Sequence, residues 1–476
     1  MKTSPHNVSG PPRVAVLTGY MPYFDELMGP EYPVDRLNWA RANAGRLGGI
    51  GEIYFSGLIK GFEDGERVSR ELDEFRPDVI VLCPTMASPA GFQWRAIEKH
   101  TSVPIVLWNV HGLQTIPPEY EATWIVPNSA NVGCMMINNI LRRHGLHPEV
   151  ITGHVDDHAM LEKLQCTVRA AAVAGQTRRA RFGVIGEPIE GYSNVVCDPD
   201  LLEKAIGARL QAIPVDEFTD AFKAVTELET EELAAQLRAR YRVETRDQEE
   251  FAASVRLCIT LRTIVERHGL SGGTYNCRHE YGVGNPDIGI IGCLANSYMT
   301  TEGCPFTCTG DIITAFAMYW AKKLGGDSYY CELDTVDYER DMVLCANTGE
   351  GDFCQSADCA RNIIRSSGSE SGWTVRGCSV AYPMPERTGT AVAFTPRAGS
   401  RGEHVIIAAE GEIRGTPDTR MQLPSMYFRF ANLPVADGMT RWISSGATHH
   451  TAICSGRHGD ALRIIANYLG IDTEIF

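Results

Sequence analysis

Short apolar runs that alternate with helix-like segments are the feature that most limits how this chain can fold. Such runs occur in RVAVLTGYM, DVIVLCPT and VPIVLWN, at residues 13–21, 78–85 and 103–109. A short, continuously apolar run is typical of a strand that is buried on both faces of a parallel sheet. The segments between the runs, including DGERVSRELDEF and SPAGFQWRAIEKH, carry apolar residues at helical intervals. The alternation therefore predicts a doubly wound α/β domain.

Two further regions follow this first α/β unit. The segment RRARFGVIGEPIEGYSN, at residues 178–194, starts again with a strand, a glycine-containing turn and a helix. From Thr388 onward, apolar or alternating runs separated by Gly and Pro are typical of an antiparallel sheet or barrel. We predict an N-terminal α/β domain at 1–175, a second doubly wound α/β domain at 176–325, and a β-rich, barrel-like domain at 326–476. The charged stretch at 226–250 is interpreted as a solvated helix.

Charge and hydropathy narrow the class of partner. The 476 residues hold 59 acidic and 44 basic side chains, a net charge of -15, which disfavours binding to nucleic acid or to an anionic membrane. No apolar stretch approaches the length of a membrane span, and the first residues lack the pattern of a secretory signal. A cytoplasmic protein with a small-molecule partner is expected. The fifteen cysteines, many of them inside apolar runs, are expected to be buried thiols.

The stretch GCPFTCTGDIITA, Gly303 to Ala315, concentrates reactive residue types just before an apolar helical run. Cys304 and Cys308 have a spacing found in some zinc sites, but no second pair at a matching spacing follows. The glycine and lysine pattern of a phosphate-binding loop is absent. Thr309 or Asp311 is suited to cap the helix that follows, which should end near Gly325. Cys308, near that helix N-terminus, is an alternative nucleophile if its thiol is acidified there.

A second cluster of polar residues lies near the end of the chain, in SGATHHTAICSGRHGD. Neutral imidazoles are ligands for Mn, Fe, Co or Zn, and carboxylates can complete such a site. Because neighbouring side chains usually point in different directions, at most one of His449 and His450 is expected to be a ligand.

Taken in order, several segments resemble the L-fucose and L-arabinose isomerase family. They are NILRRHGLHPEVITGHVDD, RFGVIGEPIEGYSN, LRTIVERHGLSGGTYNCRHE, GCPFTCTGDIITAFAMYWAKKLGGD, CELDTVDYERDMVLCANTGEGD and GATHHT. The resemblance implies two α/β domains, a barrel-like third domain, and a trimer or hexamer with active sites between subunits. It also implies a divalent cation such as manganese and the interconversion of an aldose and a ketose through an enediolate. Loops of the first domain, with Tyr20, Asn109, His111 and Gln114, would then reach a neighbour's site, and the alternative for His111 is a purely structural histidine.

The resemblance also assigns roles to particular residues, with one gap. It implies Asp334 and His450 as metal ligands and places the family's proton-transfer carboxylate at Thr309, beside Asp311. A threonine hydroxyl cannot accept a proton from carbon as a carboxylate does. A second departure is Ala346-Asn347-Thr348, where relatives tend to have His-Cys-Gly. Nearby acids that could replace the missing base are Glu280, Glu302, Asp311, Glu332, Glu350 and Asp352.

Three functions remain open at this point. The leading hypothesis is a metal-assisted aldose–ketose isomerase that acts on a small sugar, with Thr309, Asp311 and Asp334 in its catalytic corner. The second is other enediolate chemistry on the same fold, such as that of an epimerase, a decarboxylase or a C–C lyase. The third is a sugar-binding protein without catalytic activity.

Overall fold

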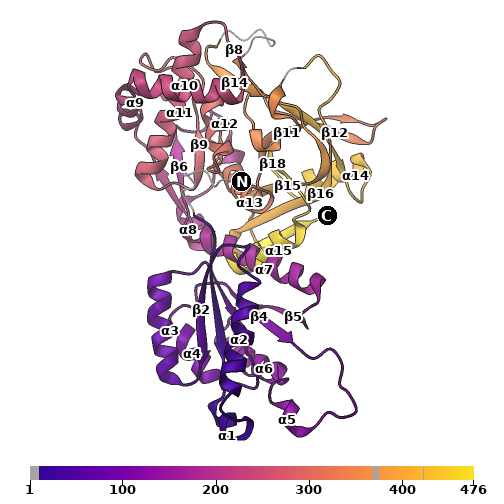
Figure 1. Ribbon diagram of the computed structural model, residues 1–476. Helices are drawn as coiled ribbons and strands as arrows, with labels where there is room; N and C mark the ends of the chain where they lie inside the picture. The colour runs from indigo at the N-terminus through magenta and orange to yellow at the C-terminus, as the bar shows by residue number, and fades with distance from the viewer. Residues whose placement is uncertain (1–9, 368–374, 422) are drawn as a thin grey trace. The chain divides into compact units, whose positions relative to one another are not determined.

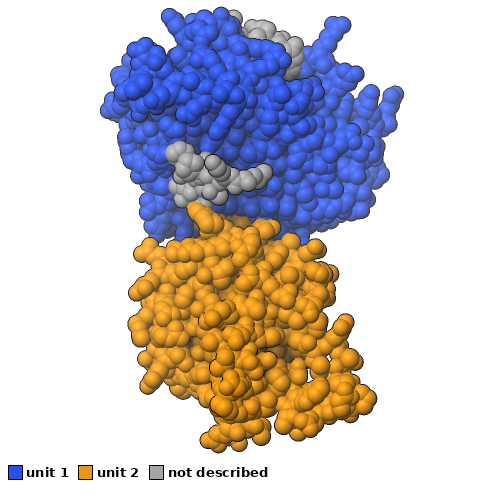
Figure 2. All heavy atoms as spheres, viewed as in Figure 1, with its two compact units in different colours: residues 1–9, 178–476 blue, residues 10–177 orange. Residues whose placement is uncertain are grey.

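The computed structural model describes residues 10–367, 375–421 and 423–476. They form two compact units, residues 10–177 and residues 178–476 (Figures 1 and 2). Within the described residues, no helix has both the length and the apolar character that crossing a bilayer requires.

The first unit, Gly10–Thr177, is built on a five-stranded parallel sheet with strand order β2-β1-β3-β4-β5 (Figure 1). The apolar runs seen in the sequence form β1, β3 and β4, so the predicted parallel α/β unit is confirmed. The strands are β1 (Arg13–Gly19), β2 (Glu52–Ile59), β3 (Val79–Leu82), β4 (Ile105–His111) and β5 (Glu149–His154). The helices are η1 (Pro22–Phe24), α1 (Asp25–Met28), α2 (Tyr32–Gly45), α3 (Phe62–Phe75), α4 (Ala90–Ile97), α5 (Ala122–Ile125), α6 (Ala130–Arg143) and α7 (His158–Thr177).

Packing around this sheet follows from the alternation of its side chains. Ala15 and Leu17 of β1 point to the face that packs with the apolar side chains of α3, α4 and α6. Helix α7 contacts β1, β3, β4 and β5. At Gly175, α7 comes so close to the sheet that a Cβ atom would lie 2.0 Å from the carbonyl oxygen of Asp78. Only glycine allows the helix this approach.

The second unit contains three sheets. A parallel sheet of order β10-β9-β6-β7 comes first, a three-stranded sheet has order β14-β13-β8, and a larger sheet has order β15-β18-β11-β12-β17-β16-β19. In the larger sheet β15 also pairs with β16, so six strands pair in a closed ring and β19 adds to β16. The strands are β6 (Arg181–Ile185), β7 (Arg209–Ala212), β8 (Arg242–Glu244), β9 (Gly272–Tyr275), β10 (Phe306–Thr307), β11 (Tyr329–Asp337), β12 (Met342–Ala346), β13 (Ile363–Ser366), β14 (Cys378–Ala381), β15 (Glu386–Pro396), β16 (His404–Arg414), β17 (Ser425–Phe430), β18 (His450–Ser455) and β19 (Asp472–Ile475).

The helices of the second unit pack against these sheets. They are η2 (Ser193–Val195), α8 (Pro199–Ile206), α9 (Val215–Ala224), α10 (Glu227–Arg240), α11 (Gln248–His268), α12 (Cys293–Thr301), α13 (Ile312–Gly325), η3 (Phe353–Gln355), η4 (Cys359–Arg361), η5 (Arg401–Glu403), α14 (Val435–Ser444) and α15 (Gly459–Leu469). The chain is thus mixed α/β with parallel sheets and a strand-rich C-terminal region, as predicted. The three-domain division stays a prediction, because residues 178–476 form one compact unit.

One helical expectation is wrong. The charged stretch at 226–250 is not a single helix, because α10 ends at Arg240 and Arg242–Glu244 form β8. Strand β8 pairs in parallel with β13, more than a hundred residues further along the chain, and such a distant partner overrides the local charge pattern.

Helix α13 joins the parallel sheet to the larger sheet, since it contacts β9 and β10 on one side and β11, β15 and β18 on the other. All its residues from Ile312 to Ala321 are buried. Asp311 caps the helix, its Oδ1 accepting a hydrogen bond from the N–H of Thr314 at 3.0 Å. Gly326, just after the last helical residue, takes the left-handed C-cap conformation with φ 78°. The predicted cap and helix are therefore confirmed.

Candidate functional site

Asp311, the residue that caps helix α13, also contacts the side chain of His450. Oδ2 of Asp311 lies 2.7 Å from Nδ1 of His450, the first residue of β18. The hydroxyl of Tyr330, on β11, lies 2.7 Å from the same nitrogen and donates to Oδ2 of Asp311 at 3.4 Å. Asp311 and Tyr330 are fully buried and His450 is buried. A carboxylate beside Nδ1 is the arrangement that orients a histidine for metal binding through Nε2.

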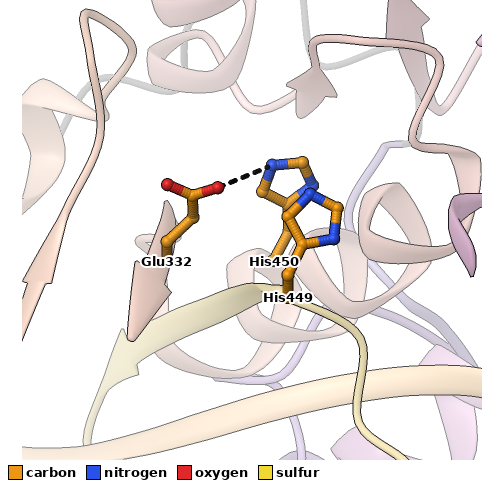
Figure 3. Close-up of side chains that lie close together, drawn as sticks. All are labelled: Glu332, His449 and His450. Carbon is orange, nitrogen blue, oxygen red and sulfur yellow. Dashed lines mark ion pairs between the residues drawn. The ribbon is translucent and has the colours of Figure 1, made fainter. Parts of the chain in front are cut away.

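The other ring nitrogen of His450, Nε2, lies beside a second carboxylate. Cross-strand pairing places Glu332 of β11 opposite His450 of β18, and Oε1 of Glu332 is 3.7 Å from Nε2 of His450. Figure 3 shows Glu332 pointing toward the two imidazole rings of His449 and His450. One potential ligand atom from each of these three residues lies within 4.8 Å of the others. We call these three residues the Glu332 group.

The two histidines do not diverge as expected. Their ring centroids are 3.8 Å apart, and Nδ1 of His449 lies 2.8 Å from the side-chain nitrogen Nδ2 of Asn194. The alternation that sends neighbouring side chains apart applies inside a strand, whereas β18 begins only at His450 and His449 belongs to the preceding loop. The expectation that the two side chains point in different directions is therefore wrong, whereas the expectation that at most one of them is a ligand stays a prediction.

The donor chemistry of the Glu332 group fits a divalent transition metal. One carboxylate and two imidazoles are suitable ligands for Mn, Fe, Co or Zn. Burial, followed by the neighbouring His450, lowers the pKa of His449 and so favours the neutral imidazole that a metal requires. Asp311 supplies the carboxylate that orients a metal-binding histidine from its far nitrogen. The fit rests on residues of β11 and β18, of the loop before β18, and on the N-cap of α13.

The structure separates Asp334 from this group. Asp334 lies at a β-bulge, where the pairing of β11 with β12 shifts between Leu333 and Thr335, and its side chain is exposed. Burial of part of the carboxyl, followed by the charge of Glu332, raises the pKa of Asp334. Of the predicted site residues, Asp311 and His450 are in direct contact. Asp334 lies two residues from Glu332 along the chain and outside the Glu332 group.

Thr309 occupies a strained corner between β10 and α13. Its φ of 62° lies in the left-handed region, which is an outlier for a β-branched residue. Its hydroxyl donates to the carbonyl oxygen of Cys308 at 2.7 Å. The side chains of Thr309 and Tyr330 also interact, which links this corner to His450. The predicted residues Thr309, Asp311 and His450 are therefore linked through Tyr330.

A cavity of about 330 Å³ opens at this corner. It lies at the carboxyl ends of the parallel strands β9 and β10, where ligands commonly bind in α/β folds. Its lining comprises Asn276, Cys277, Arg278, Val283, Ile291, Cys293, Cys308, Thr309, Thr348, Glu350, Ser367, Val375 and Leu423. The cavity thus contains both positions at which the sequence departs from the isomerase pattern, the corner at Thr309 and the loop at Thr348.

Cys308 is not an acidified thiol. Burial, followed by the charge of Glu350, raises its pKa well above the usual value of 9.0. The expected helix N-terminus effect is absent because Asp311 takes the capping position and a carboxylate faces the thiol. Most of the other cysteines are buried free thiols, as predicted.

Sequence reasoning missed Tyr330, Asn194 and the pairing of Glu332 with His449 and His450. Glu332 was one of several nearby acids, and nothing in the local sequence distinguishes it. The signal is the register of β11 against β18, which only the fold supplies.

Comparison with known proteins points to sugar isomerases, although no family model matches the chain. The chain is 22% identical over 282 residues to the sulfoquinovose isomerase of Alkalicoccus urumqiensis, covering 58% of this chain and 60% of the relative. It is also 22% identical over 296 residues to the sulfoquinovose isomerase of Priestia megaterium, covering 60% of this chain and 63% of the relative. The L-arabinose isomerase of Bifidobacterium longum is 25% identical over 166 residues, covering 35% of this chain and 33% of the relative.

The chain therefore spans about three fifths of the length of the sulfoquinovose isomerases that it matches. The sugar isomerase part of the resemblance is supported, whereas its fucose isomerase part is not tested by these relatives. A solute-binding protein of Burkholderia multivorans covers 57% of this chain at 12% identity, but with a TM-score of 0.18 this likeness carries no argument.

Proposed function

We propose that this protein is a sugar isomerase that interconverts an aldose and a ketose of small size. The observation that carries the proposal is the Glu332 group, a set of potential metal ligands in a chain similar to sugar isomerases. Tyr330 links His450 of this group to Thr309, which lines the cavity. The sulfoquinovose and arabinose isomerases among its relatives act on sugars by name, so a sugar or sugar derivative is the proposed substrate.

Glu332, His449 and His450 are the proposed ligands of a divalent cation, with manganese as the first choice. The resemblance assigns Asp334 to this role, but the distances favour Glu332. When bound, the cation would stabilise the negative charge that develops on the sugar oxygens of an enediolate. Asp311 and Tyr330 would orient His450, and the cavity next to Thr309 would hold the carbon chain of the sugar.

The finer features of the resemblance are proposals as well. The closed ring of strand pairs supports a barrel-like third domain, and the sheet order of the first unit supports a doubly wound domain. We also propose an oligomer, a trimer or hexamer with active sites between subunits, and a cytoplasmic location.

Proton NMR in D2O tests the proposal. Manganese-loaded protein is incubated with L-arabinose, L-fucose and sulfoquinovose, and both ketose formation and deuterium uptake at C1 or C2 are followed. Ketose formation with deuterium uptake supports the isomerase. Cleavage products favour a C–C lyase, and inversion at C2 favours an epimerase. No reaction together with sugar binding favours a sugar-binding protein.

A further inference from the structure

We propose that Glu350 is the catalytic residue that moves the proton between C1 and C2, in place of the carboxylate that Thr309 lacks. This inference rests on the proposed function. Glu350 is the only carboxylate among the described residues that line the cavity, and Thr309 lines the same cavity. The proposal therefore assigns the lost role to an acid at the same substrate-binding space.

Three other acids predicted as replacements for the missing base already bind other groups or belong to the proposed metal site. Asp352 accepts from Nζ of Lys322 at 2.6 Å, and from two backbone N–H groups. Asp311 is committed to Thr314 and His450, and Glu332 belongs to the proposed metal site. Each of these carboxylates already has a partner that a proton carrier would have to give up.

Glu350 is held firmly at one oxygen and left open at the other. Nδ2 of Asn296 donates to Oε1 at 3.0 Å. Oε2 is buried and has no hydrogen-bond partner, and the residue as a whole is 3% exposed. A buried carboxylate oxygen without a donor is costly, so such an atom in a cavity wall is expected to face a ligand. In the proposed reaction that ligand is a hydrogen atom on the sugar carbon.

The loop that departs from the family pattern positions this acid. Oδ1 of Asn347 accepts from the N–H groups of Gly349 and Glu350, at 2.9 Å and 2.8 Å. This turn, centred on residues 347–350, directs Glu350 toward the cavity. Burial also raises the pKa of Glu350 above its usual 4.5, although hydrogen bonds from Asn296 and the neighbouring Cys308 oppose the shift. A raised pKa suits a group that must both accept and return a proton.

The proposed step is balanced without an external oxidant or reductant. The Glu350 carboxylate takes the proton from C2 of the open-chain aldose, the C2–H electron pair becomes the C1–C2 double bond, and the carbonyl pair moves onto O1. Protonated Glu350 then returns the proton to C1. The hydroxyl proton of O2 passes to O1, so the product is the ketose.

The test compares Glu350→Gln with wild type in D2O, using manganese-loaded protein with L-arabinose and sulfoquinovose. We expect turnover and deuterium uptake at C2 to fall by about 10²–10⁴-fold, the usual contribution of general acid–base catalysis. Manganese affinity, followed by electron paramagnetic resonance, should stay within about twofold. Glu339→Gln, an exposed acid between β11 and β12 that does not line the cavity, is the matched control and should keep full activity.

The outcomes separate the two proposals. An active wild type with an equally active Glu350→Gln variant overturns the role of Glu350 alone. A wild type that exchanges no sugar proton overturns both, because Glu350 then has no proton to carry. Glu350→Asp, which keeps a carboxylate one methylene shorter, should retain measurable exchange. A Gln variant that loses manganese binding, or an Asp variant as inactive as a folded Gln variant, shows a structural role instead.

Discussion

Oδ2 of Asp311 and Nδ1 of His450 lie 2.7 Å apart, so the cap of helix α13 is also the partner of the proposed metal-binding histidine. The same carboxyl group uses Oδ1 for the helix and Oδ2 for the histidine. The two functions can be separated by substitution, because asparagine caps a helix about as well as aspartate but carries no charge.

Asp311→Asn should therefore weaken metal binding and preserve the helix. We expect manganese affinity to fall roughly 10–100-fold, as is usual when the partner of a metal-binding histidine is removed. Asp311→Ala should lose the cap as well, at a cost of about 1 kcal/mol in the free energy of unfolding. Calorimetric titration with Mn²⁺ and urea unfolding measure the two effects. Asp337→Asn, at the end of β11, is the control; unchanged affinity in Asp311→Asn would contradict the prediction.

Glu332 and Asp334 compete for the role of carboxylate ligand, and matched amide variants decide between them. We expect Glu332→Gln to weaken manganese binding at least tenfold, about 1.4 kcal/mol, because its Oε1 faces Nε2 of His450. Asp334→Asn should change the affinity by less than about threefold, since its exposed side chain lies outside the Glu332 group. A larger loss of affinity in Asp334→Asn than in Glu332→Gln would instead support Asp334 and His450 as the ligands, as the resemblance implies.

The sequence predicts best where the determining interactions are local. The apolar runs that became β1, β3 and β4, and the cap, body and end of α13, depend on neighbouring residues. The strand β8 inside a charged stretch was not predictable, because its pairing partner β13 is distant in sequence.

The candidate site also combines residues that the local sequence indicates with contacts that only the fold creates. Asp311, Thr309 and His450 were predicted as site residues from motif positions, whereas the pairing of Glu332 with His450 depends on the register of β11 against β18. The open oxygen of Glu350 depends on the packing of α12, through Asn296, against the loop that follows β12. Neither relationship can be derived from spacing, because each joins elements from separate parts of the chain.

Thr309→Glu should restore a ligand to the catalytic corner. We expect manganese affinity to rise about tenfold, because a carboxylate at this position would join the Glu332 group through the corner that already contacts Tyr330. The left-handed φ of 62° does not oppose the change, since glutamate is less restricted there than the β-branched threonine. Thr309→Gln has nearly the same shape without the charge and is the control. Equal manganese affinity in the Glu and Gln variants would contradict the prediction.

Glu350→Gln should make the metal-free protein more stable at pH 8 while it lowers activity. Burial raises the pKa of Glu350 in the folded state, so the folded protein binds this proton more tightly than the unfolded chain does. The stability that this group contributes is fully present below pH 4.5 and is lost as the pH rises through the folded-state pKa. The neutral amide avoids that loss. Urea unfolding from pH 4 to pH 8 should show that the difference in unfolding free energy between variant and wild type widens as the pH rises. If this difference in unfolding free energy narrows with rising pH, the fold stabilises the charged carboxylate. Glu350 would then have a structural role in place of a catalytic one.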